Sequence, residues 1–158
     1  MGVTGCGKST IGALLAKQLG ARFLDGDDLH PAANIAKMSS GQPLNDADRA
    51  PWLDRIGQRI AAVDGAVIMA CSALKRSYRD RIRQQAGCSV TFLLLQGSRA
   101  VIESRMALRA GHFMPTSLLD SQFATLEPFG AEEAFVTVDI DQSVVAVVAA
   151  LADGIGQA

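Results

Sequence analysis

The first ten residues contain the feature that most constrains this chain. Gly2-Val3-Thr4-Gly5-Cys6-Gly7-Lys8-Ser9-Thr10 matches the phosphate-binding loop pattern G-x-x-x-x-G-K-S/T at every fixed position. Gly5 and Gly7 let the backbone turn tightly and approach an anion, so that N–H groups of the loop face phosphate oxygens. In such a loop Lys8 reaches the β- and γ-phosphates, and the Ser9 hydroxyl can bind the Mg²⁺ that bridges them. The sequence therefore predicts that residues 2–10 bind nucleotide phosphates together with Mg²⁺.

The residues after this loop favour a helix that starts near Lys8. Ile11, Leu15 and Leu19 recur at helical spacing, and Gly20 stands where a helix C-cap is expected. Such a helix directs the positive end of its dipole at the phosphates. The loop and the helix therefore support one another as a phosphate site.

The segment before the loop is unusually short. A phosphate-binding loop normally follows a buried β-strand, whereas only Met1 precedes Gly2 here. We therefore expect one of two arrangements. Either the first strand is truncated in this chain, or another segment takes its place in the sheet.

Apolar runs alternate with helical patterns along the rest of the chain. Strands are expected at 22–25, 66–70, 90–95 and 135–140. Helices are expected at about 31–39, 51–63, 73–85, 99–110, 116–123 and 142–151, with Pro51 opening the second of these, and Ser72 and Asp141 capping the third and the last. This alternation predicts an α/β fold with a doubly wound parallel sheet flanked by helices, in which residues 1–158 form one domain.

Composition excludes several classes of function. A length of 158 residues suits one domain, and 15 basic against 16 acidic side chains argue against a general nucleic-acid binder. No apolar run approaches the length of a membrane span, and no signal peptide is visible. Three cysteines at irregular spacing argue against a disulfide framework or a zinc site. These features favour a protein of the reducing cytoplasm, with neither nucleic acid nor membrane as a partner.

Acidic residues follow the first expected strand. Asp25-Gly26-Asp27-Asp28 stands at the carboxyl end of residues 22–25, which is the end where open α/β sheets bind ligands. Carboxylates there can meet Mg²⁺ or a substrate hydroxyl. The alternative is a solvated acidic turn.

Basic residues recur near the same edge of the predicted sheet. Arg49 precedes the helix expected at Pro51 and is free to reach a ligand, or it forms a surface ion pair with Asp46 or Asp48. Lys75 lies in the expected first turn of a helix, where a cation opposes the dipole. That unfavourable placement indicates an anionic ligand.

A second pair of cations precedes a loop rich in Gly and Pro. Arg105 and Arg109 are four residues apart and so lie on one side of a helix, which the segment 111–115 interrupts. This pattern is typical of a lid that brings positive charge over a transferring phosphoryl group. We place such a lid-like segment at about 105–128. An exposed helix end with cations is the alternative.

Together these residues predict phosphoryl transfer from Mg·ATP to a small anionic acceptor. The chain also resembles the small P-loop gluconate kinases, which are relatives of shikimate kinase and the nucleoside monophosphate kinases. The matching residues are 2–10, 23–31 (FLDGDDLHP), 34, 37–39, 41, 43–44, 46–53, 70–76 (ACSALKR), 78–80, 111–115 (GHFMP), 118–119, 121–123 and 126–128. They span nearly the whole chain, and those beyond the loop are particular to this family.

The resemblance implies transfer of the ATP γ-phosphate to the 6-hydroxyl of D-gluconate, which gives 6-phosphogluconate, by a cytoplasmic and commonly homodimeric enzyme. It implies these roles: Lys8, Asp27 and Arg105 in catalysis; residues 2–10 and Arg109 in ATP binding; Asp27, His30, Arg49 and Lys75 in gluconate binding; Ser9 and, through water, Asp25 at Mg²⁺. Two alternatives remain open. One is a kinase for another small anion such as shikimate, and the other is a nucleotide-binding protein without transfer activity.

Overall fold

The computed structural model describes residues 1–107 and 116–156. The strands are β1 (Arg22–Asp25), β2 (Val67–Ala70), β3 (Phe92–Gln96) and β4 (Phe135–Asp139). The helices are α1 (Lys8–Leu19), the 3-10 helix η1 (Gly26–Leu29), α2 (Ala32–Ser39), α3 (Asp46–Ala61), α4 (Arg76–Ala86), α5 (Arg99–Ala107), α6 (Thr116–Thr125) and α7 (Val144–Ile155). The predicted alternation of strands and helices is confirmed.

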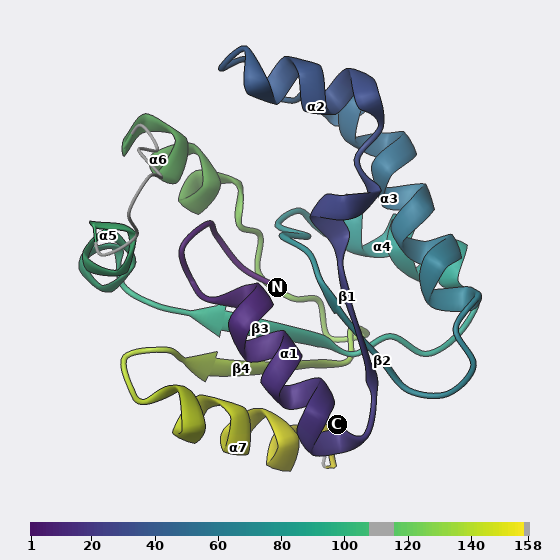
Figure 1. Ribbon diagram of the computed structural model, residues 1–158, viewed down its shortest axis with the longest axis vertical. Helices are drawn as coiled ribbons and strands as arrows, with labels where there is room; N and C mark the ends of the chain where they lie inside the picture. The colour runs from purple at the N-terminus through teal and green to yellow at the C-terminus, as the bar shows by residue number, and fades with distance from the viewer. Residues whose placement is uncertain (108–115, 157–158) are drawn as a thin grey trace.

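The described strands form two parallel pairs with helices on both sides. β1 pairs with β2, Arg22 opposite Val67, and β3 pairs with β4, Phe92 opposite Phe135. Helices α1 and α7 lie side by side over one face, and α3 packs on α4 beyond the other (Figure 1). Two apolar clusters follow from this layering. One draws on α1, β3, α5, β4 and α7, and the other draws on α3, α4 and β3.

Met1 lies where the strand before the loop was expected. Its amino group donates to the Leu93 carbonyl, and the Leu95 N–H donates to the Met1 carbonyl at 3.0 Å. This is the pattern of a parallel bridge centred on Leu94. The Gly2 N–H donates to the Ser72 carbonyl at 3.3 Å, just beyond β2. Among the described residues, no segment other than Met1 and Gly2 lies between β2 and β3, so that no other part of the chain takes the place of that strand.

Helix α3 begins earlier than the sequence pattern indicated. Asn45 caps it, with its side chain accepting from the Asp48 N–H while the Asp48 carboxylate accepts from the Asn45 N–H, both at 2.8 Å. This capping box starts the helix at Asp46 and places Pro51 inside it, not in its first turn. Arg49 consequently lies on the helix and not before it.

Two other predicted caps are wrong. Ala73 adopts a φ of 46°, which keeps residues after β2 out of the helix, so that α4 begins at Arg76 with Lys75 as its N-cap instead of Ser72. Helix α7 is capped by Ser143, whose hydroxyl accepts from the Ala146 N–H at 3.2 Å. The N–H of Asp141 instead donates to the Asp139 carboxylate, which closes a local turn.

A fully buried ion pair joins α4 to the segment before β4. Arg79 and Glu133 have no exposed side-chain surface, and the guanidinium Nε donates to Glu133 at 2.7 Å. Its remaining N–H groups reach Glu133 again and the carbonyls of Leu74, Glu127 and Pro128. All five donors are thereby used. The pair fixes the chain that leads out of α6.

Breaking this pair is expected to destabilise the fold strongly. Arg79→Met leaves the buried Glu133 carboxylate with only the Arg83 guanidinium, at 3.4 Å, and we expect a loss of about 3–5 kcal/mol in the free energy of unfolding. Arg81→Met is the matched control. Arg81 lies on α4 like Arg79 and pairs with Asp54 of α3 at 2.6 Å, but its side chain is 42% exposed. That change is expected to cost at most about 1 kcal/mol. Equal losses in urea unfolding would contradict the role given to Arg79.

The same carboxylate makes stability depend on pH. The hydrogen bonds from Arg79 lower the pKa of Glu133 from 4.5 to about 2. A depressed acid pKa stabilises the fold above the unfolded value, and this contribution disappears as pH falls toward 2. The difference in unfolding free energy between the native chain and Glu133→Gln should therefore shrink below pH 4.5, by at most about 1.4 kcal/mol per pH unit. A difference that is constant between pH 5 and pH 3 would contradict this.

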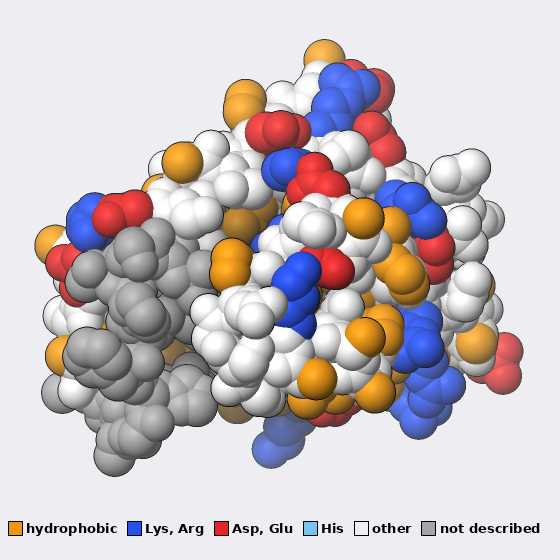
Figure 2. All heavy atoms as spheres, turned by 90° about the horizontal axis from the view of Figure 1, so that it is seen from above, with side chains coloured by type: hydrophobic (Ala, Val, Ile, Leu, Met, Phe, Trp, Pro, Cys, Tyr) orange, Lys and Arg blue, Asp and Glu red, His pale blue; other side chains and the backbone are white. Residues whose placement is uncertain are grey.

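The surface carries both charges. On the face drawn in Figure 2, basic and acidic side chains are interspersed, in keeping with a net charge of −1. Among residues 1–107 and 116–156, no helix is both long and apolar enough to cross a bilayer.

Candidate active site

The phosphate-binding loop has the backbone geometry that its glycines permit. Gly5 has a φ of 82°, and Gly7, the N-cap of α1, has a φ of 96°, a region that other residues rarely adopt. A Cβ at Gly5 would lie 2.7 Å from Cγ of Met106 on α5. Val3 and Cys6 are buried and hold the loop against the core. A side chain at Gly5 would therefore clash with Met106 and Ile102 of α5 and would strain the backbone.

Lys8 and the start of α1 supply positive charge to this loop. Lys8 is the first residue of α1, and its Nζ donates to the carbonyls of Gly2 at 3.2 Å and Val3 at 3.0 Å. The ammonium thus lies over the loop at the positive end of the helix dipole. An anion at this place would be attracted by both the Lys8 ammonium and the positive end of the helix dipole.

A hydrogen-bond chain connects the loop to the acidic segment after β1. The Ser9 hydroxyl donates to Oδ2 of Asp25 at 2.6 Å, and Oδ1 of Asp25 accepts from the Asp27 N–H at 3.1 Å. The Asp27 side chain is exposed on η1. Trp52 of α3 steadies η1, because its indole N–H donates to the Gly26 carbonyl at 2.7 Å. Three of the predicted residues therefore form one continuous network.

The oxygens of Ser9 and Asp25 fit a magnesium ion. Mg²⁺ bound with a nucleotide takes one or two protein oxygens beside phosphate oxygens and water. The hydroxyl and the carboxylate converge to 2.6 Å at the phosphate loop, and both are the hard oxygen donors that Mg²⁺ prefers.

Arg105 reaches the loop from α5. Its Nη1 lies 3.8 Å from the position that a Cβ would take on Gly7, and its Nη2 donates to the Ile140 carbonyl. This contact fixes the guanidinium beside the loop. Arg109 and the segment 111–115 of the predicted lid lie outside the described residues.

Gln122 of α6 also contacts the loop, and sequence reasoning assigned it no role. Its Oε1 accepts from the Thr4 N–H at 2.6 Å, and its Nε2 donates to the Thr4 hydroxyl at 3.1 Å. The available signal was its place in one of the family-specific segments. Gln122 ties the described end of the lid-like segment to the phosphate loop.

Arg49 and Lys75 line one cavity of about 500 Å³. Asp46 lies between them: it accepts from Lys75 Nζ at 2.7 and 2.9 Å, accepts from the Tyr78 hydroxyl, and is 4.0 Å from the Arg49 guanidinium. Arg49 also donates to the Tyr78 hydroxyl at 3.5 Å. Ser72 and Gln122 add polar groups to the cavity wall.

This cluster has charge effects that suit anion recognition. The hydrogen bond to Asp46 raises the pKa of Lys75, which stays a cation at neutral pH. Burial, and then the hydrogen bond to Asp46, raises the pKa of Tyr78, so its hydroxyl keeps its proton. Sequence reasoning weighed Asp46 only as a surface partner of Arg49 and did not assign Tyr78 a role. Asp46 is 29 positions from Lys75 and 32 positions from Tyr78, so no local sequence pattern indicated that they would meet.

His30 lies at the end of η1 and not in the wall of that cavity. Its ring stacks on Trp52 with centroids 4.3 Å apart, and its Nδ1 lies 3.3 Å from the Asn34 amide nitrogen. Burial lowers its pKa, against the attraction of Asp27. His30 is therefore neutral at pH 7, and it can form hydrogen bonds with a ligand but not an ion pair.

Comparison with known proteins agrees with this geometry. The chain matches the family model of an AAA domain over residues 1–129. It is 48% identical to the thermoresistant gluconokinase of Escherichia coli strain K12, across 94% of this chain and 87% of that protein. It is 49% identical to the gluconokinase of Gluconobacter oxydans strain 621H, across 87% of this chain and 79% of that protein. The crystal structure of a gluconokinase from Sinorhizobium meliloti 1021 superposes with a TM-score of 0.88 at 47% identity, covering 99% of this chain and 89% of that chain. The chain therefore belongs to the gluconokinase family of P-loop kinases.

Proposed function

We propose that this protein transfers the γ-phosphoryl group of ATP to the 6-hydroxyl of D-gluconate. The observation that carries the proposal is a phosphate loop that Ser9 and Asp25 connect to Asp27, and that Gln122 connects to the cavity lined by Arg49 and Lys75. Phosphoryl transfer is mostly positioning and charge stabilisation, and this arrangement offers both. The gluconokinase names of relatives at 48% and 49% identity support the choice of acceptor.

The ATP side of the site uses the loop and α1. N–H groups of residues 2–10 bind the phosphates, and Lys8 neutralises charge on the β- and γ-groups. Ser9 and, through water, Asp25 would hold Mg²⁺, which would neutralise charge on the transferring group. Arg105 steadies the same group from α5.

The acceptor side matches the chemistry of gluconate, an open-chain carboxylate with several hydroxyls. Lys75 and Arg49 supply cations for the carboxylate. Tyr78, Ser72 and Gln122 supply hydrogen-bonding groups for hydroxyls in the same cavity. Asp27 receives the proton of the attacking hydroxyl, and neutral His30 orients the sugar chain next to it.

An acceptor panel tests the proposal. ADP release from Mg·ATP is measured with the purified chain alone and with D-gluconate, shikimate or D-glucose. We expect release only with gluconate, and ³¹P NMR should show a new phosphomonoester. ADP release with shikimate but not with gluconate would show that shikimate is the acceptor and that gluconate is not. Saturable ATP binding without release on any acceptor would indicate a nucleotide-binding protein and overturn the proposal.

Replacement of Arg105 tests the contribution of α5. Arg105→Ala removes a fixed cation beside Gly7 and is expected to lower kcat by about 10²-fold, with little change in the KM for gluconate. Arg99→Ala is the control, because Arg99 lies on the same helix and pairs with Glu103 and Asp120 on the surface. Equal kcat values for the two variants would remove Arg105 from the mechanism.

We also infer the compartment and the oligomeric state of the enzyme. Cys6 and Cys71 are free and buried, which supports a reducing compartment, and we infer the cytoplasm. The family resemblance supports a homodimer, which light scattering at micromolar concentration tests directly.

A further inference from the structure

The acceptor cavity with Arg49 and Lys75 in its wall also contains a carboxylate. Among the described residues that line it, the charged ones are Asp46, Arg49 and Lys75. The Asp46 carboxylate accepts from Lys75 Nζ with both of its oxygens, at 2.7 and 2.9 Å, and it also accepts from the Tyr78 hydroxyl. Two cations and one carboxylate leave this part of the cavity wall with one net positive charge.

The two cations differ in what they still offer to a ligand. Both lie over the Tyr78 ring, with Arg49 at 5.8 Å and Lys75 at 5.4 Å from its centroid. The Lys75 ammonium is paired with Asp46, whereas the Arg49 guanidinium lies 4.0 Å from that carboxylate. Within the described part of the chain, Arg49 donates one hydrogen bond, to the Tyr78 hydroxyl at 3.5 Å, out of the five that a guanidinium can donate. Arg49 therefore keeps donors for an incoming anion, while Asp46 already neutralises Lys75.

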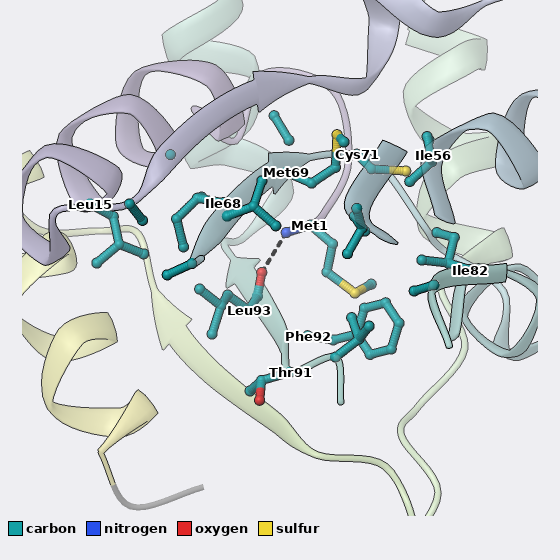
Figure 3. A pocket seen from close by; sticks show the side chains of 18 of the residues that line it. Met1, Leu15, Ile56, Ile68, Met69, Cys71, Ile82, Thr91, Phe92 and Leu93 are labelled. Atoms are coloured by element: carbon teal, nitrogen blue, oxygen red, sulfur yellow. Dashed lines mark hydrogen bonds between the residues drawn. The ribbon is translucent and has the colours of Figure 1, made fainter. Parts of the chain in front are cut away.

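Two other features of the fold leave this balance unchanged. Asp48 of α3 is close enough to interact with Arg49, but it pairs with Lys37 at 2.5 Å and is not among the described residues that line the cavity. A larger cavity, of about 700 Å³, lies between β2 and β3, and its wall consists mainly of apolar side chains such as Phe92 and Leu93 (Figure 3). An anion would lose its hydration there. The smaller cavity is therefore the better place for a charged acceptor.

We propose that Asp46 is a specificity-determining residue, which makes the acceptor cavity select a head group with one negative charge over a head group with two. A carboxylate pairs with Arg49 and leaves the cluster neutral. A phosphate ester leaves it with an excess negative charge beside the Asp46 carboxylate, and like charges at this distance repel. The cavity thus favours a sugar acid over a sugar phosphate. This inference rests on the proposed function in one respect, namely that the cavity holds the anionic group of the acceptor.

Two ligands that differ in their head group test the inference. D-Gluconate has a carboxylate where D-glucitol 1-phosphate has a phosphate ester, which is mostly dianionic at about pH 7.5. Calorimetry without nucleotide gives the Kd of each ligand for the native chain, Asp46→Asn, Asp46→Glu and Asp54→Asn. Asp54 is the matched control, because it also joins α3 to α4, through Arg81 at 2.6 Å, and is not among the described residues that line the cavity. Asp46→Glu keeps the negative charge.

We expect the native chain and Asp54→Asn to bind gluconate roughly tenfold more tightly than glucitol phosphate, or better. Asp46→Asn should lower this ratio by roughly tenfold, because it removes the repelling charge and frees the Lys75 ammonium, and Asp46→Glu should restore it. A purely structural role would weaken both ligands alike. The inference is overturned if Asp46→Asn keeps the native ratio, if the native chain binds both ligands equally, or if either chain binds neither. Because ADP release is not a readout, these outcomes leave phosphoryl transfer to the acceptor panel.

Discussion

Replacement of Lys8 by methionine is expected to lower kcat/KM for ATP by about 10³-fold. The Lys8 ammonium lies over the phosphate loop, within 3.2 Å of the carbonyls of Gly2 and Val3. There it is a side-chain cation beside the place where negative charge would gather during transfer, and a fixed donor of this kind is worth roughly 10²–10³ in rate. Methionine keeps the apolar stem and removes only the charge.

Two measurements make the Lys8 prediction specific. Steady-state kinetics should show the loss in kcat as well as in ATP affinity, because the charge acts on both bound and transferring phosphate. Lys17→Met is the matched control on the last turn of the same helix, and it should keep the native rate. A Lys8→Met enzyme within threefold of the native rate would show that the loop N–H groups bind and stabilise the phosphates without the Lys8 charge.

Asp27→Asn is expected to lower kcat by roughly 10²–10⁴-fold, with ATP affinity nearly unchanged. The Asp27 backbone N–H bonds to Asp25, and this contact does not depend on the Asp27 side chain. Asparagine keeps the size of the side chain and removes the group that accepts a proton. The loop, Ser9 and Asp25 should therefore bind Mg·ATP as before.

A neighbouring acid provides the comparison for Asp27. Asp28 lies next to it on η1 and is also exposed, so Asp28→Asn removes the same charge from the same segment. We expect that variant to keep most of its activity, since only Asp27 is given a role at the hydroxyl. Equal losses in the two variants would show a general effect of negative charge, and near-normal turnover of Asp27→Asn would remove it from the mechanism.

Errors at helix ends show where local rules compete. Pro51 and the Asn45–Asp48 capping box both mark a helix start. The helix begins at the box, because the two side chains accept hydrogen bonds from the backbone N–H groups of Asn45 and Asp48 at once. Ser72 is a good cap residue, but the left-handed Ala73 beyond it keeps the chain extended to Lys75. In that segment the Leu74 carbonyl accepts from the Arg79 guanidinium and from the Glu127 N–H. Long-range contacts thus outweighed a local preference.

The sequence by itself determined the phosphate loop, α1 and the acids after β1. Each of these depends on spacing within a few residues, and Ser9 and Asp25, both expected at Mg²⁺, meet although they are 16 positions apart. It also identified Arg49 and Lys75 as candidates through their chemistry, without showing what lies between them.

Only the tertiary structure decided how distant residues meet. It placed Asp46 between Lys75 and Arg49, buried Arg79 with Glu133 across 54 positions, and opened a cavity between β2 and β3. Charge pairing and burial act through space, and a basic residue on a helix looks the same in sequence whether water or a carboxylate surrounds it.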